Sequence, residues 1–174
     1  ALSSARYAYM LAPPADDLVH ALKYEGWPEL APLMASAMAS LSVPNEGGRA
    51  LVIPVPTTAK RLRTRGYNQA GLLAESYASA RALPLEELLV RAGADTSQTS
   101  LHPSERRANV AGAFSLAAGA SAVLEGAHVL LIDDVLTTGA TVCEAAETLL
   151  MSGAARVTLI AYARALPSDR FAAV

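Results

Sequence analysis

A short apolar run followed at once by two acids constrains this chain more than any other stretch. Residues 129–132 (Val-Leu-Leu-Ile) have the composition of a strand that is buried on both faces, as in a parallel sheet. Two carboxylates at its end, Asp133 and Asp134, would be costly to bury, so we expect them to emerge into a crevice. A threonine-rich turn follows, and then a helix with apolar residues at helical spacing. This order predicts a binding site at the end of a central strand.

The turn at residues 137–141 has the chemistry of a phosphate site. Its backbone N–H groups and threonine hydroxyls can surround a phosphate at the positive end of the following helix. Asp133 and Asp134 can accept hydrogen bonds from vicinal sugar hydroxyls or from metal-bound water. The stretch therefore predicts a site for a phosphorylated sugar. The alternative is an ordinary buried strand followed by an acidic turn.

The same string resembles the phosphoribosyl pyrophosphate (PRPP) signature of type I phosphoribosyltransferases. In that signature an apolar strand leads into two acids and then into Thr-Thr-Gly-x-Thr, and residues 129–141 match it throughout. A Walker A loop would indicate a nucleoside triphosphatase instead, but neither Lys23 nor Lys60 follows a glycine.

The composition favours a folded domain without a general attraction to polyanions. The 174 residues are 52% apolar and 17% charged, which suits one domain with a sizeable core. The net charge of −2 gives no global attraction to nucleic acid or anionic membranes. All but two of the 14 cationic residues are arginine, whose planar fork suits phosphate.

The single cysteine, Cys143, excludes an internal disulfide and a multi-cysteine zinc site within this sequence, and its helical position suggests a small core residue. No uncharged apolar run is long enough to cross a membrane, and no signal-peptide pattern opens the sequence. We therefore expect a cytoplasmic protein without membrane insertion.

Helical and strand patterns alternate along the rest of the chain. Residues 16–26, with Asp16 or Asp17 as the cap, and residues 28–41 read as helices. Further on, the patterns predict strands over 50–55, 85–90, 113–116 and 156–163, and a helix over 68–82. This alternation predicts an α/β fold, with a mainly parallel sheet flanked by helices in residues 49–174 and a small N-terminal helical hood in residues 1–48.

Four cations lie within six positions after the strand predicted at 50–55: Lys60, Arg61, Arg63 and Arg65. Such a run is ordinarily a solvated surface or a weak nucleic-acid patch. Ligands of parallel sheets, however, bind outside the carboxyl ends of the strands. The position of the run therefore favours a role in ligand binding.

Several stretches together resemble the ComF family of competence-associated, phosphoribosyltransferase-like proteins. They are Ala-Leu-Lys-Tyr at 21–24 with Gly26, Ile-Pro-Val-Pro at 53–56, Arg-Thr-Arg-Gly-Tyr-Asn-Gln-Ala at 63–70, Gln-Thr-Ser at 98–100, and Arg-Arg-Ala-Asn-Val at 106–110 with Gly-Ala-Phe at 112–114. The Arg-Gly-Tyr-Asn-Gln segment is the most diagnostic, and the resemblance extends from residue 18 to residue 164. Family members typically begin with a four-cysteine zinc ribbon, which was either lost here or lies upstream of Ala1.

The resemblance implies a role for each part of the site. The PRPP 5-phosphate would be bound by Thr137, Thr138, Gly139, Ala140 and Thr141. Asp133 and Asp134, the candidate catalytic residues, would hold the ribose hydroxyls and Mg²⁺, the metal mostly through those hydroxyls or water. Pyrophosphate would be bound by Pro56, Thr57, Thr58, Ala59, Lys60, Arg61, Arg63 and Arg65. A flexible loop over residues 93–107 would close over the site with Gln98, Thr99, Ser100, Arg106 and Arg107.

These roles imply a Mg²⁺-dependent transferase, in which pyrophosphate leaves the anomeric carbon and a nitrogenous acceptor attacks. The acceptor is not readable from the sequence. Tyr162 and Arg164 are candidates for its pocket, as are Tyr24 and Trp27. Lys23, Tyr24 and Trp27 could also lie over the mouth of the ligand site, although packing is the favoured interpretation for these three.

Two alternatives stay open. One is a non-catalytic protein that binds single-stranded DNA during uptake, with the basic run on the phosphates and Tyr67 stacking on a base. The other is a PRPP-sensing regulator. A second copy of the chain, forming a homodimer, is a further candidate partner.

Overall fold

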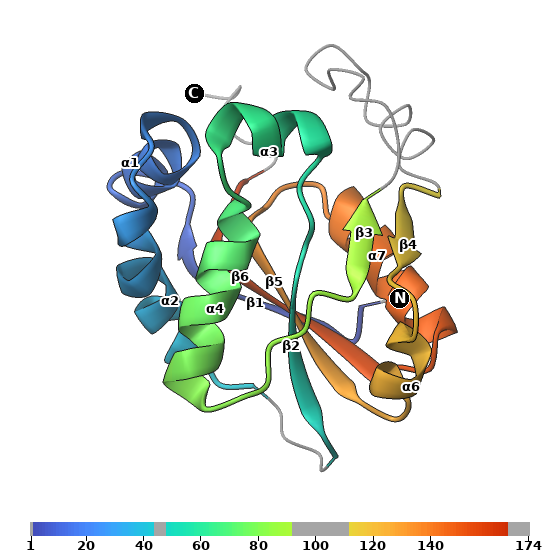
Figure 1. The fold of residues 1–174 in the computed structure, drawn as a ribbon. Coiled ribbons are helices and arrows are strands. Elements are labelled where there is room, and N and C mark those ends of the chain that lie inside the picture. Colours follow the sequence, from blue (N-terminus) through green and yellow to red (C-terminus); the bar gives the residue numbers. More distant parts are fainter. Residues whose placement is uncertain (1, 44–47, 92–111, 167–174) are drawn as a thin grey trace.

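Four parallel strands form the central sheet of the computed structural model, which describes residues 2–43, 48–91 and 112–166. The strands are β1 (Ser4–Met10), β2 (Ala50–Pro54), β5 (His128–Leu136) and β6 (Arg156–Arg164). Their order across the sheet is β1-β6-β5-β2, and each neighbouring pair is parallel (Figure 1). Because β5 and β6 have partners on both sides, their side chains are mostly buried, as the apolar run at 129–132 predicts.

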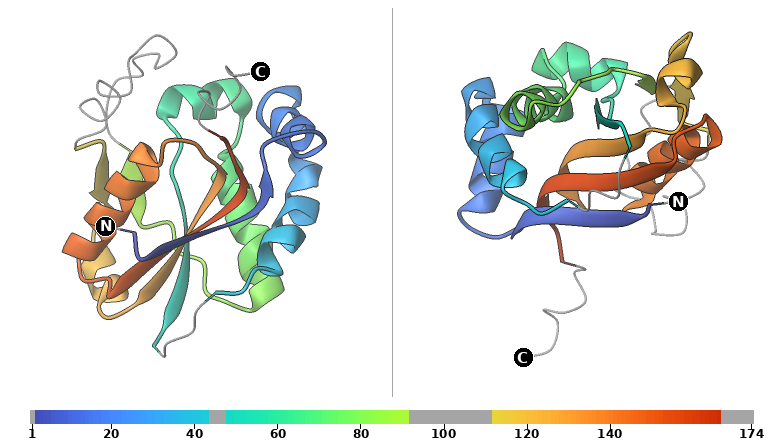
Figure 2. Two further views of the ribbon diagram at one scale, coloured as in Figure 1. Left: turned by 180° about the vertical axis from the view of Figure 1, so that it is seen from behind. Right: turned by 90° about the horizontal axis from the view of Figure 1, so that it is seen from below.

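Helices cover both faces of the sheet, as the view from below shows (Figure 2). One face carries α1 (Ala15–His20), α2 (Ala31–Ala39) and α4 (Gln69–Arg81), and the other carries α6 (Ala120–Leu124) and α7 (Ala140–Met151). Alternate side chains of β5 serve the two layers: Val129 and Leu131 belong to the core on the α7 side, and Leu130 and Ile132 to the core on the α2–α4 side. The predicted α/β fold with a mainly parallel sheet is confirmed.

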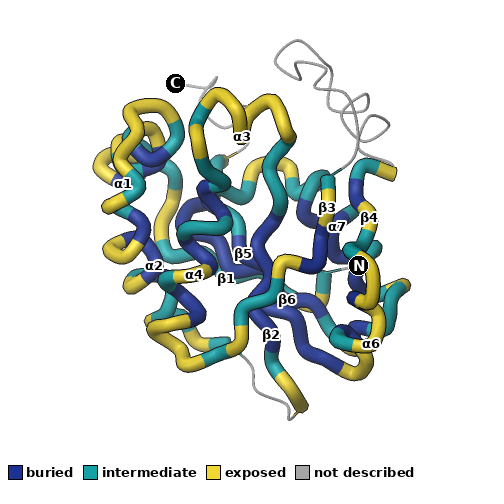
Figure 3. The backbone as a smooth tube through the Cα atoms, in the orientation of Figure 1, coloured by how far each residue is buried: buried dark blue, intermediate teal, exposed yellow. Residues whose placement is uncertain are grey.

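Shorter elements complete the described chain. A π-helical turn, η1 (Ala21–Glu25), continues α1, and a 3₁₀ turn, η2 (Pro28–Leu30), precedes α2. The short helix α3 (Ala59–Arg65) follows β2 and is exposed over most of its length (Figure 3). Strands β3 (Leu89–Arg91) and β4 (Phe114–Leu116) form a separate antiparallel pair that packs on the α7 side.

The N-terminal segment differs from its sequence prediction at one point. The helices predicted at 16–26 and 28–41 are present as α1 with η1 and as η2 with α2, but within the expected helical hood of residues 1–48 β1 is an edge strand paired with β6 from Ser4 to Met10. Its side chains are half-buried or exposed, so the sequence lacks the strong apolar alternation that marks a strand. The strand over 85–90 is also shorter than predicted, since Leu85 makes only an isolated bridge to Val52.

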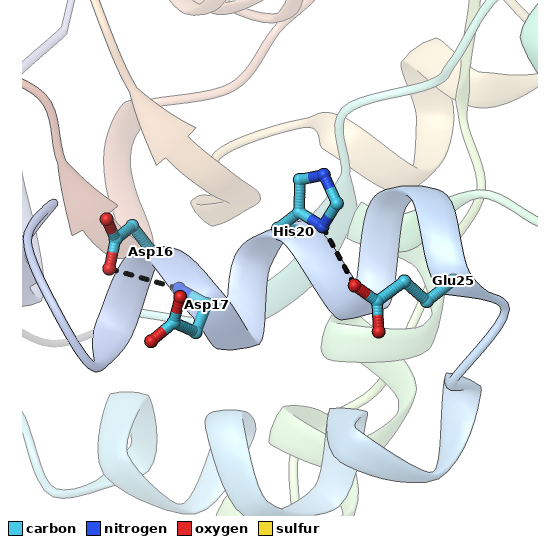
Figure 4. A network of polar contacts seen from close by, with 4 residues as sticks. All are labelled: Asp16, Asp17, His20 and Glu25. Carbon is cyan, nitrogen blue, oxygen red and sulfur yellow. Dashed lines mark hydrogen bonds and ion pairs between the residues drawn. The ribbon is translucent and has the colours of Figure 1, made fainter.

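The start of α1 is also different. Pro14 precedes the helix, and neither acid caps it with a side-chain hydrogen bond; the Asp16 carboxylate instead accepts the N–H of Asp17 (Figure 4). Cys143 is exposed on α7 and is not a core residue. The predicted loop over 93–107 lies outside the described residues. No helix in the described ranges is long and apolar enough to span a bilayer.

Candidate functional site

A cavity of about 500 Å³ lies at the carboxyl ends of β2 and β5. Segments far apart in the sequence form its wall: α1 with η1, the exit from β2, α3 with the start of α4, the end of β3, and the end of β5 with the start of α7. Helices α1 and α3 lie side by side beyond this end of the sheet (Figures 1 and 2). The cavity is therefore where ligands of parallel sheets usually bind.

The acidic pair lies in the cavity wall, as the sequence predicts. Because side chains alternate along β5, the two carboxylates leave the strand on opposite faces. Asp134 is 8% exposed, and its Oδ2 atom lies 3.0 Å from Nζ of Lys23 on η1. Asp133 is half-buried, and its Oδ1 atom accepts the N–H of Asp134 at 2.9 Å.

The two acids have different electrostatic surroundings. Burial, together with the adjacent charge of Asp134, raises the pKa of Asp133 to about 7. Lys23 and Arg91 oppose this rise in the pKa but do not cancel it. Near neutral pH the Asp133 carboxyl is thus close to its titration point, whereas Asp134 is held beside a lysine ammonium.

Gly139 begins α7 and gives the turn its shape. Its φ of 79° is left-handed, a conformation that side chains disfavour, whereas a Cβ there would meet Leu136 Cδ1 at an ordinary 3.6 Å. The requirement for glycine therefore comes from the backbone and not from lack of space. Thr137, Gly139 and Thr141 line the cavity, whereas Thr138 and Ala140 are not part of its wall.

Only some cations of the basic run after β2 face the cavity, because the run forms the helix α3. Arg61 and Arg65 are four residues apart, share one face of the helix and line the cavity together with Pro56 and Thr57. Lys60 and Arg63 lie outside the cavity wall, as do Thr58 and Ala59. Thr58 instead caps α3, since its hydroxyl oxygen accepts the N–H of Arg61.

The Arg-Gly-Tyr-Asn-Gln segment at 65–69 is hydrogen-bonded to η1 and to the exit of β2, two other parts of the cavity wall. The Tyr67 hydroxyl donates to the Leu22 carbonyl at 2.7 Å, and the Asn68 amide donates to the Val55 carbonyl at 3.1 Å. The Arg65 guanidinium lies 4.9 Å from the ring centre of Tyr24. Tyr67 is thus engaged with η1, which argues against its predicted role in stacking on a base.

The sequence interpretation missed several residues of the wall. Packing was favoured for Lys23 and Tyr24, yet both line the cavity. Gln69 also lines it; this residue is 4% exposed, and its Nε2 has no hydrogen-bond partner among the residues that the structure describes. The Lys-Tyr pair at 23–24 and the Asn-Gln pair at 68–69 both belong to the stretches that resemble the ComF family. That membership could have indicated that these residues line the site. The predicted acceptor residues Trp27, Tyr162 and Arg164 are not part of the wall.

The carboxylates of the cavity suit Mg²⁺ that is held mainly by its waters and by a substrate. Within the described ranges no three acidic, histidine or cysteine residues gather into a metal cage. Two adjacent carboxylates fit Mg²⁺ that keeps its waters and shares oxygen ligands with a phosphorylated substrate, which is the usual way proteins bind this ion.

Comparisons with known proteins agree on one family. The phosphoribosyl transferase domain family matches residues 64–170. The DNA utilization protein YhgH of Salmonella typhimurium is 32% identical over 165 residues, which are 88% of this chain and 69% of that protein. Competence protein F of Haemophilus influenzae is 36% identical over 115 residues, covering 66% of this chain and 50% of that protein. The chain belongs to the ComF family of phosphoribosyltransferase-like proteins.

The ComF chain accordingly has a type I phosphoribosyltransferase-like fold. Among solved structures, the allosteric regulatory enzyme of purine biosynthesis is 20% identical, covers 78% of this chain and 25% of its own, and has a TM-score of 0.42. An overlap of this size adds nothing to the assignment, which rests on the sequence relatives. The family match includes both the acidic pair and the turn at 137–141.

Proposed function

We propose that this ComF-family protein binds PRPP with Mg²⁺ in the cavity and transfers the phosphoribosyl group to a nitrogenous acceptor. One observation carries the proposal: the acidic pair, the glycine-initiated helix α7 and two arginines of α3 line a single cavity. Each of these three parts matches the chemistry of one part of PRPP.

The start of α7 suits the 5-phosphate. The first N–H groups of a helix lack partners within the helix, and the helix dipole favours an anion there. Thr137 and Thr141 add hydroxyls from the cavity wall. Thr138 is a weaker candidate than the sequence suggested, because its Oγ1 atom faces the N–H of Ala140 at 3.5 Å.

Arg61 and Arg65 suit the pyrophosphate, since guanidinium groups bind phosphate oxygens through paired hydrogen bonds. In the proposed reaction the bond between the ribose C1 atom and the pyrophosphate oxygen breaks, and pyrophosphate keeps the electron pair. The acceptor nitrogen uses its lone pair to form the new C1–N bond and then loses a proton. Bound Mg²⁺ would supply further neutralisation of the leaving pyrophosphate.

The protein's contribution is orientation and electrostatics. Asp134 and Asp133 would hold the ribose hydroxyls, while Arg61 and Arg65 would stabilise the charge that builds up on pyrophosphate. The test is pyrophosphate release from Mg²⁺-PRPP across a panel of nitrogenous acceptors, beside calorimetric titration with PRPP. Acceptor-dependent release supports the transferase. Tight PRPP binding without release for any acceptor supports the PRPP-sensing alternative, and no PRPP binding contradicts both.

A second candidate, single-stranded DNA binding, is favoured by the surface next to the cavity. Lys60 and Arg63 are exposed on α3, and Tyr24 and Trp27, on and just after η1, are 65% and 55% exposed. The contact between Arg65 and Tyr24 joins this basic helix to one exposed aromatic ring. Cations beside exposed aromatic rings suit an unpaired strand, and the relatives are called a DNA utilization protein and a competence protein.

Oligonucleotide affinity measured at two salt concentrations tests this candidate. Phosphate contacts predict a steep fall in affinity at higher salt, which flattens in a Lys60→Ala, Arg63→Ala double variant. An equal salt dependence in both proteins would contradict it.

A further inference from the structure

The ion pair between Lys23 and Asp134 joins the N-terminal segment to the proposed ligand site. The two side chains are 21% and 11% exposed, so solvent screens the pair only in part. Lys23 lies on the π-helical turn η1, and such turns are frequent at functional sites. The lysine also lines the cavity beside the acid pair.

Neighbouring contacts fix the position of this lysine. The carbonyl of the preceding residue, Leu22, accepts the Tyr67 hydroxyl, and the ring of the following residue, Tyr24, lies under Arg65. Residues on both sides of Lys23 are therefore fastened to the segment that begins at α3. A lysine held in this way is preorganised against Asp134, unlike a freely moving surface lysine.

The ammonium group occupies one of the two Asp134 carboxylate oxygens to which a metal ion or its water could bind. Lys23 Nζ lies 3.0 Å from Asp134 Oδ2, which is hydrogen-bonding distance and leaves no room for a metal ion or a metal-bound water on that side. Two cations at one carboxylate also repel each other.

We propose that Lys23 is the counter-ion of Asp134 in the ligand-free protein and competes with Mg²⁺ for that carboxylate. The inference rests on the proposed placement of Mg²⁺ at the acidic pair. It follows that free Mg²⁺ binds weakly, and that the metal would enter together with PRPP, whose pyrophosphate would supply further oxygen ligands. Lys23 then separates from Asp134 when the complex forms.

Metal titration without PRPP tests the competition directly. Mn²⁺, detected by electron paramagnetic resonance, is the probe. Lys23→Met is expected to bind Mn²⁺ about tenfold more tightly than the natural protein, because an opposing charge has gone. Lys23→Arg, which keeps the cation, should bind Mn²⁺ as the natural protein does. Lys60→Met controls for the loss of one positive charge outside the cavity and should change Mn²⁺ affinity less than about twofold.

The natural protein offers an independent readout because it contains only two lysines, Lys23 and Lys60. After reductive methylation with ¹³C, each lysine gives its own resonance. Addition of Mg²⁺-PRPP should shift the Lys23 signal and change the Lys60 signal much less.

The outcomes separate this inference from the proposed function. No binding of Mg²⁺-PRPP by the natural protein contradicts the proposed function. Binding without a shift of the Lys23 signal, or Mn²⁺ affinity in folded Lys23→Met no higher than in the natural protein, overturns the competition. If Lys23→Met does not fold, Lys23→Gln takes its place in the same titration.

Discussion

Tyr67 donates its hydroxyl hydrogen to the backbone carbonyl of Leu22 across a distance of 2.7 Å. This bond ties the connection between α3 and α4 to η1 and so holds two walls of the cavity at a fixed separation. Asn68, the next residue, holds the exit of β2 through the Val55 carbonyl. The most diagnostic segment of the sequence is therefore a clamp, and its tyrosine acts through the backbone of η1.

Tyr67→Phe removes that bond and keeps the ring. We expect the free energy of unfolding to fall by roughly 1 kcal/mol, because the Leu22 carbonyl loses its partner. Urea denaturation measures the change. Tyr9→Phe is the matched control, since Tyr9 is exposed on the edge strand and should change stability by less than about 0.5 kcal/mol. Equal stability of Tyr67→Phe and the natural protein would contradict the clamp.

Arg65→Ala and Arg63→Ala form a matched pair on α3. Arg65 lines the cavity and Arg63 does not. Loss of a charge-assisted hydrogen bond should weaken PRPP binding about ten- to hundredfold in Arg65→Ala, with ribose 5-phosphate affinity nearly unchanged. Arg63→Ala should leave both affinities as they are. Calorimetric titration decides, and equal losses for PRPP and ribose 5-phosphate would remove the pyrophosphate assignment.

Thr141→Ala tests the proposed phosphate turn. Thr141 lines the cavity and Thr138 does not, so ribose 5-phosphate affinity should fall about tenfold or more in Thr141→Ala and clearly less in Thr138→Ala. Inorganic phosphate should follow the same order. A larger loss in Thr138→Ala would mean that the phosphate lies on the other side of the turn.

Gly139→Ala tests the backbone conformation of that turn. Because φ is 79°, we expect the alanine to destabilise the fold by about 1–2 kcal/mol although its Cβ has room. Thermal unfolding measures this cost. Gly71→Ala, a helical glycine with a negative φ, is the control and should not show this loss. An unchanged unfolding temperature in Gly139→Ala would contradict a left-handed residue at the helix start.

Asp133→Asn tests the raised pKa. The pKa of Asp133 is about 7 in the folded protein, whereas an ordinary aspartate has a pKa of 3.8. Between these two pH values the folded state therefore holds a proton on Asp133 that the unfolded chain has lost. Stability should therefore fall as the pH rises from about 4 to about 7. The full shift corresponds to about 4 kcal/mol, of which we expect roughly half because Asp133 is only half-buried, and the variant should lose this part of the decline. Denaturation with a chelator present measures the difference. Parallel pH profiles for both proteins would contradict the raised pKa.

Sequence patterns were sufficient wherever a local rule decides the structure. Neighbouring residues determine the central strand and the turn after it. A strand buried on both faces needs a continuous apolar run, as at 129–132, and a left-handed turn favours glycine, as at Gly139. Local order also placed the arginine-rich run at the cavity, since it follows directly after β2.

Tertiary structure decided what depends on residues distant in the chain. Helical geometry selected Arg61 and Arg65 from the basic run, and pairing with β6 made a strand of β1 although its own pattern is weak. The contact between Lys23 and Asp134 forms because η1 packs beside the end of β5. No pattern of neighbouring residues encodes that contact, since the chain brings the two charges together only when the layers of helices close on the sheet.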